Sequence, residues 1–123
     1  MDAAAILPQI KSIIARWRSD GVNLTAIEID YDAPTSRLAD YQKLLRALRQ
    51  ELPSDITLSI TELPTWISSP LLLPMLAVVD STVLQLHSVQ SPKQGLFDPI
   101  LAQRWSTQYA LISPHPFYLA LPA

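Results

Sequence analysis

Hydrophobic residues recur along the chain with two periods, one typical of helices and the other typical of strands. The first helical pattern covers residues 8–18, with Pro8 in its first turn and Gly21 as its C-terminal stop. The second begins at residue 35 or 36 and ends before Pro53. Its apolar residues follow i, i+3, i+4 spacing: Leu38, Tyr41, Leu44, Leu45, Leu48 and Leu52. This spacing predicts an amphipathic helix with one buried face.

Two more helical segments are expected further along the chain. A short one covers residues 68–79, where Pro74 separates a first turn from the helix proper. The other begins at Asp98, an N-cap residue followed by Pro99 at the first helical position, and runs to about Gln108. Four segments that fit strands lie between or after the helices: residues 24–32, 56–62, 82–87 and 117–121. The resulting repeat of about 26 to 35 residues is the size of a βα unit, so parallel strands with right-handed crossovers are expected.

The strands alternate between apolar and polar residues. In the second strand Leu58 and Ile60 fall on one face, while Ser59 and Thr61 fall on the other. The third strand likewise sets Leu84 and Leu86 against Gln85 and His87, and the first sets Ile27, Ile29 and Tyr31 against Glu28, Asp30 and Asp32. A doubly wound sheet is covered on both faces and would need nearly continuous apolar strands. Helices are therefore expected on one face only.

These features predict an α/β fold of parallel βα repeats that forms about half of a TIM-type (β/α)8 barrel. A complete barrel takes about 250 residues, and this chain has 123. We interpret residues 1–123 as a single partial barrel domain, either a fragment of a longer barrel or a half that pairs with a second chain. The fragment is the favoured interpretation.

The composition of the chain excludes several classes of function. Nine basic and eleven acidic residues give a net charge of −2, which provides no electrostatic footprint for nucleic acid. The absence of Cys excludes thiol chemistry, and two glycines cannot form a dinucleotide fingerprint or a phosphate-binding loop. The chain start lacks the pattern of a signal peptide, and the longest apolar stretch, residues 71–79, is too short to span a bilayer. No cofactor or metal is expected, because the acidic residues and His87 have no diagnostic ligand spacing.

The candidate chemistry lies where the strands end. Asp30 and Asp32 are two residues apart on one strand, which places their Cα atoms about 6.5 Å apart with both carboxylates on one face. Such a pair can divide acid and base roles, so both are candidate catalytic residues. The alternative is structural, with Asp32 in an Asx-type turn before Pro34 and Asp30 accepting hydrogen bonds inside the barrel.

Other side chains are expected around this pair. Candidate substrate-binding residues are Glu62, Trp66, Gln85 and His87, and candidate supporting residues are Glu28 and Thr61. Trp66 is interpreted as either a sugar-stacking platform or a cap on the core, and His87 as either a ligand contact or a structural histidine. Trp17 and Trp105, on predicted helices, are interpreted as core residues.

Two segments carry a resemblance, residues 26–32 (AIEIDYD) and 41–48 (YQKLLRAL). Together they resemble the fourth-strand signature of family 18 chitinase-like glycosidases and the helix that follows it. With residues 58–66 (LSITELPTW) and 83–87 (VLQLH), the chain is also similar, over about residues 17–122, to an uncharacterised bacterial domain-of-unknown-function family with a chitinase-like barrel. The first resemblance implies that Asp32 stands in the place of the acid and Asp30 in that of the assisting carboxylate.

The chain departs from the glycosidase signature at several positions. The acid is Glu in the signature but Asp32 here, the upstream Asp is Glu28, and a leading Asp-Gly is Thr25-Ala26. A later Met-Tyr-Asp is not matched by residues 85–87. The resemblance therefore implies a glycoside hydrolase-like barrel that acts on or binds a polysaccharide, with a rearranged acidic site.

Two alternatives remain beside this expectation. One is a non-catalytic carbohydrate-binding or scaffold domain on a degenerate barrel. The other is a magnesium-dependent phosphatase, because Asp30-x-Asp32 resembles the acidic pair of haloacid-dehalogenase-like enzymes, although Pro34 replaces their Thr or Val. The expected partners are a carbohydrate and the rest of the barrel or a second chain, with no nucleic acid and no membrane span. The family resemblance implies the cell envelope or secretion.

Overall fold

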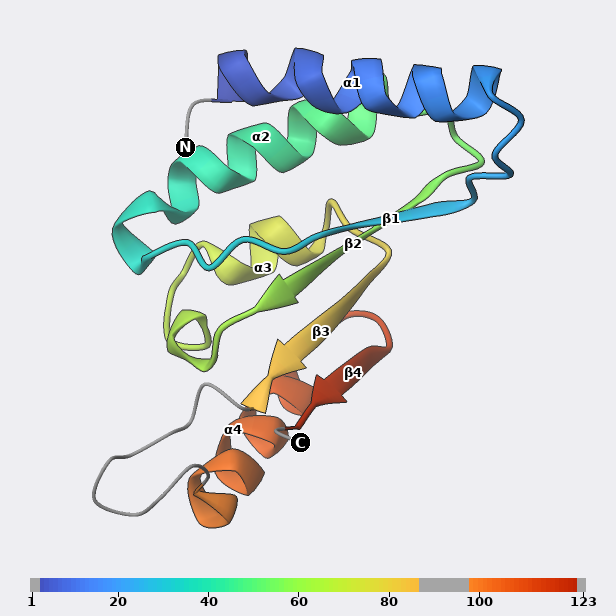
Figure 1. Ribbon diagram of the computed structural model, residues 1–123. Helices are drawn as coiled ribbons and strands as arrows, with labels where there is room; N and C mark the ends of the chain where they lie inside the picture. The colour runs from blue at the N-terminus through green and yellow to red at the C-terminus, as the bar shows by residue number, and fades with distance from the viewer. Residues whose placement is uncertain (1–2, 87–97, 122–123) are drawn as a thin grey trace.

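The computed structural model describes residues 3–86 and 98–121. In this part of the chain four parallel strands form one sheet: β1 (Ala26–Ile29), β2 (Thr57–Glu62), β3 (Ser81–Gln85) and β4 (Phe117–Ala120). Neighbours in the sheet are also consecutive in the chain, in the order β1-β2-β3-β4 (Figure 1). The expected α/β class with parallel strands is confirmed.

Helices precede each strand. They are α1 (Ala3–Ser19), α2 (Leu38–Glu51), α3 (Leu72–Leu76) and α4 (Pro99–Ile112), with 3-10 turns η1 (Thr35–Arg37) and η2 (Pro64–Trp66). Figure 1 shows α1 and α2 together beyond β1, α3 beside β2, and α4 beside β3 and β4. The helices cover one face of the sheet, because right-handed crossovers between strands that are consecutive neighbours all return on the same side.

The strand register confirms the predicted polar face. Glu28 pairs with Ser59, and Thr61 pairs with Val83, so these residues share one face. The opposite face carries Leu58 and Ile60, both 0% exposed beneath the helices. The face with Glu28 and Ser59 is called the open face below.

Local signals explain most of the helix ends. Gly21 has a φ of 84°, the left-handed conformation that favours glycine, and ends α1 as predicted. Asp98 caps α4, since its Oδ1 accepts hydrogen bonds from the backbone N–H groups of Ile100 (3.1 Å) and Leu101 (3.0 Å). Several helix boundaries differ from the prediction. The helix α1 begins at Ala3, so Pro8 lies inside it, and α4 continues to Ile112. The helix α2 begins only at Leu38, after η1, and α3 covers Leu72–Leu76 rather than the whole of residues 68–79.

The core lies between α2, the sheet and α3. Tyr41, Leu44, Leu45 and Leu48 of α2 are 0% exposed, as the helical spacing predicted. Trp17 is 46% exposed, so its interpretation as a core residue is wrong: the adjacent Ile14, rather than Trp17, faces the core.

Truncating the α2 core face is expected to destabilise the domain. Leu45→Ala leaves a cavity where a 0% exposed side chain lay, and should lower the free energy of unfolding by about 2–5 kcal/mol in urea denaturation. Leu73→Ala is the matched control, because Leu73 is 53% exposed and its loss should cost far less. Equal losses for the two variants would contradict this account of the core.

Candidate functional site

Three carboxylates form a row along the open face, and each accepts a hydrogen bond from a side chain on another strand. Glu28 Oε1 accepts a hydrogen bond from Ser59 Oγ at 3.4 Å, and Asp30 Oδ1 accepts one from Thr61 Oγ1 at 2.9 Å. Asp32 Oδ1 accepts from Gln85 Nε2 at 3.1 Å, a contact that passes over the end of β2 to reach β3. We call these six residues the carboxylate row. The structure thus brings together five of the predicted site residues.

The row runs from the strands to the edge where they end. Asp30 and Asp32 follow the last residue of β1 and are exposed, whereas Thr61 and Gln85, which donate to them, are each only 7% exposed. The hydrogen-bond donors therefore form the floor and the carboxylates project to the surface. A carboxylate accepts about four hydrogen bonds, so one fixed donor leaves capacity for a ligand.

Trp66 holds the turn that follows Asp32. Its indole Nε1 donates to the Ala33 carbonyl oxygen at 2.8 Å, and both residues are 0% exposed. The Tyr41 ring lies between two others, with ring centroids 5.2 Å from Tyr31 and 5.9 Å from Trp66, both edge-on. The stacking-platform interpretation of Trp66 is therefore wrong, since the ring is buried, and the alternative of a cap on the core is confirmed.

Glu62 lies away from the carboxylate row. It pairs with Leu84 on the helix-covered face and is 1% exposed, so it cannot contact a ligand from solvent. The expectation that Glu62 binds substrate fails because its neighbour Thr61 takes the open-face position. His87, also expected there, lies outside the described residues.

Burial determines the protonation state of the Glu62 carboxyl group. Within the described residues neither of its carboxylate oxygens has a hydrogen-bond partner in ordinary geometry. Burial raises the pKa of Glu62 from 4.5 to about 8, and a contact with the Tyr109 hydroxyl offsets part of this rise. The Tyr109 hydroxyl also shares a 2.6 Å hydrogen bond with Thr82 Oγ1. Glu62 is consequently neutral over most of the physiological pH range.

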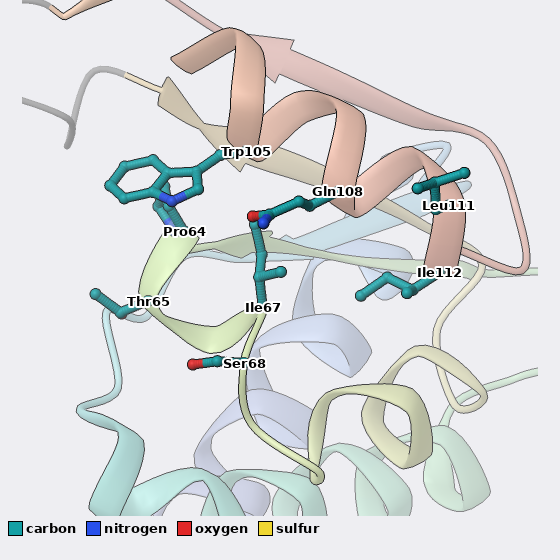
Figure 2. Close-up of a pocket in the computed structure, with 8 residues that line it drawn as sticks. All are labelled: Pro64, Thr65, Ile67, Ser68, Trp105, Gln108, Leu111 and Ile112. Atoms are coloured by element: carbon teal, nitrogen blue, oxygen red, sulfur yellow. The ribbon is translucent and has the colours of Figure 1, made fainter. Parts of the chain in front are cut away.

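A cleft lies beyond the carboxylate row, between η2 and α4 (Figure 2). Trp105 and Gln108 of α4 line it, although Trp105 was expected in the core. Their spacing with Ile112 (i, i+3, i+7) places all three on one helical face, and this was the sequence signal available for them.

The described residues contain no group of three or more His, Asp or Glu side chains placed to hold a metal ion. No helix among them is long and apolar enough to cross a membrane.

The fold and the carboxylate row define an α/β domain with a one-sided parallel sheet and an acidic open face. The chain belongs to the family described as Domain of unknown function (DUF3142), whose model matches residues 1–123. This confirms the expected membership of a domain-of-unknown-function family. Neither the curated proteins nor the solved structures include a significant match.

Glu62 makes stability depend on pH. Between pH of about 4.5 and 8 the folded protein keeps a proton that the unfolded chain releases, so the free energy of unfolding should fall as pH rises through this window. Glu62→Gln removes this titration and should stabilise the protein above pH 8 relative to wild type, by on the order of a few kcal/mol. Urea denaturation of both proteins across the window measures the difference. If the free energy of unfolding changes with pH in the same way in both proteins, the pKa of Glu62 is not raised in the folded state.

Proposed function

We propose that this domain is glycoside hydrolase-like and acts on, or binds, a polysaccharide at the open face. The observation that carries the proposal is the carboxylate row: Asp30 and Asp32 are exposed where the strands end, and each is held by a buried donor from another strand. Glycoside hydrolysis uses two carboxyl groups on the two sides of one bond. The resemblance of residues 26–32 to a chitinase-like signature supports the same pair.

We further propose that the sheet is part of a (β/α)8 barrel. Consecutive strand order and one-sided helices are what a barrel requires, and active sites of barrels lie where the strands end. The contact between Asp32 and Gln85 adds support, because the two side chains meet over β2 and a concave sheet shortens that gap. The remaining strands would pair with the edges of β1 and β4, from the same polypeptide or from a second chain.

The two aspartates take different roles in this proposal. Asp32 is the general acid that protonates the leaving oxygen, and Gln85 holds one of its oxygens so that the other faces the substrate. Asp30 stabilises positive charge on the sugar ring in the oxocarbenium-like transition state, with Thr61 fixing its orientation. Water adds to the anomeric carbon as the bond to the leaving oxygen breaks, and its released proton restores the acid form of Asp32. Both donors are neutral, so they orient the aspartates without neutralising them.

The second candidate is a non-catalytic carbohydrate-binding domain. The hydrogen bonds of the carboxylate row favour it, since carboxylates held by neutral donors can accept hydrogen bonds from sugar hydroxyl groups without any reaction. Binding without turnover separates this candidate from the first.

The test is Asp32→Asn in the full-length protein, against a panel of chromogenic oligosaccharides. The amide keeps the size and the contact with Gln85 but cannot deliver the proton, so hydrolysis should fall by about 10²-fold or more while sugar binding persists. Asp55→Asn is the control, because Asp55 lies before the start of β2, at the other end of the sheet, and its side chain is 70% exposed.

The other outcomes decide between the candidates. Unchanged hydrolysis in Asp32→Asn would reject the acid role, and wild-type binding with no turnover would support the binding domain. Magnesium-stimulated cleavage of a phosphate monoester would favour the phosphatase alternative instead.

A further inference from the structure

The cleft between η2 and α4 is a second candidate binding site. It is open to solvent, has a volume of about 620 Å³, and is lined by Pro64, Thr65, Ile67, Ser68, Trp105, Gln108, Leu111 and Ile112 (Figure 2). Small-molecule sites enclose about 300–1,000 Å³, so the cleft has the size of a ligand site.

The cleft exists because α3 is short. Only five residues, Leu72–Leu76, form this helix, and the segment before it is a 3-10 turn followed by further turns. The flank of α4 therefore has no full-length helix beside it, and only Ala102 and Tyr109 of α4 are buried. Trp105 is half-buried on this flank, and Leu111 is 82% exposed.

The lining offers neutral hydrogen-bonding groups beside an aromatic ring. None of the eight residues is charged. In Figure 2 the amide of Gln108 extends from α4 toward Ile67, while Thr65 and Ser68 lie on the opposite wall. Within the described residues the side chains of Thr65, Ser68 and Gln108 have no hydrogen-bond partner. These three groups are available to a ligand.

This combination discriminates between classes of ligand. A lining without charge gives no attraction to an anion or a metal ion. An apolar helix or an alkyl chain would cover the three polar groups without pairing them, which costs free energy for each. A pyranose ring meets both requirements, because it carries hydroxyl groups around its rim and an apolar C–H face that can lie on an indole.

We propose that this cleft binds a neutral sugar ring, with Trp105 against the face of the ring and Gln108, Thr65 and Ser68 hydrogen-bonded to its hydroxyl groups. The site is separate from the carboxylate row and needs no hydrolysis. Trp66 and Ala33 connect the two, since η2 forms one wall of the cleft and bonds to the turn after Asp32.

Nuclear magnetic resonance of the ¹⁵N-labelled full chain tests the proposal directly. The protein has three tryptophans, so three indole N–H signals are expected, and Trp105→Phe and Trp17→Phe assign two of them. Titration with cellotriose, maltotriose and N-acetylated chitotriose should move the Trp105 signal and leave those of Trp17 and Trp66 in place.

Matched variants then locate the binding. Trp105→Ala should weaken sugar affinity by about tenfold or more, and Gln108→Ala should weaken it to a smaller extent. The controls are Trp17→Ala, which removes another partly exposed indole, and Gln103→Ala, which removes an exposed amide from the same helix. Both controls should bind as wild type does. If Trp105→Ala is unfolded in thermal melts, Trp105→Phe replaces it, with a smaller expected loss.

Three results would overturn the proposal: no shift of the Trp105 signal with any of the saccharides at millimolar concentration, wild-type affinity in the Trp105 variants, or binding of decanoate but not of sugars. The Asp32→Asn variant separates this inference from the proposed function. If the Asp32→Asn variant loses hydrolysis and keeps cleft binding, both proposals are supported. If sugar perturbs only the open face, the open-face site is supported and the cleft is rejected.

Discussion

Strand order is the constraint on which the rest of the structure depends. Because β1 to β4 are consecutive parallel neighbours, the right-handed crossovers return on one side of the sheet and the helices cover one face only. Apolar residues such as Leu58 and Ile60 are needed on that face, and polar residues are tolerated on the other. This topology gives the carboxylate row access to solvent, whereas an ionised carboxylate beneath the helices would cost several kcal/mol without a partner. Glu62, which does lie there, has its pKa raised to about 8 by burial.

The elements and the polar face could be predicted from the sequence because their signals are local. A period of two residues assigns Ser59 and Thr61 to one face and Leu58 and Ile60 to the other whatever the sheet packs against. Asp98 caps α4 and Gly21 ends α1 through contacts or dihedral angles within a few residues. The same alternation places Glu62 with Ile60 on the buried face. The prediction that Glu62 binds substrate was wrong because it gave more weight to the charge of the residue than to its position in the strand.

Other features depend on contacts between distant segments, and the sequence carried no signal for them. Whether Trp66 faces solvent depends on the position of Ala33, 33 residues earlier in the chain. The cleft depends on how far α3 extends beside α4, and Pro74 gave no measure of that length. The pKa of Glu62 is a similar case, since burial raises it and a contact with Tyr109, 47 residues later in the chain, partly offsets the rise.

The buried indole of Trp66 helps to position the carboxylate row, which an exposed indole would not do as well. Asp32 lies beyond the end of β1, so its backbone is positioned by the turn at Ala33, which the Trp66 hydrogen bond holds in place. Thr61 on β2 and Gln85 on β3 then hold Asp30 and Asp32 from below. Catalytic groups need to be held within about 0.5 Å of their productive geometry by packed, hydrogen-bonded neighbours, and rigid elements do this better than loops. Three strands and one buried ring supply that support, which is why the acidic pair, rather than the more reactive-looking Glu62, is the site on which a function can be built.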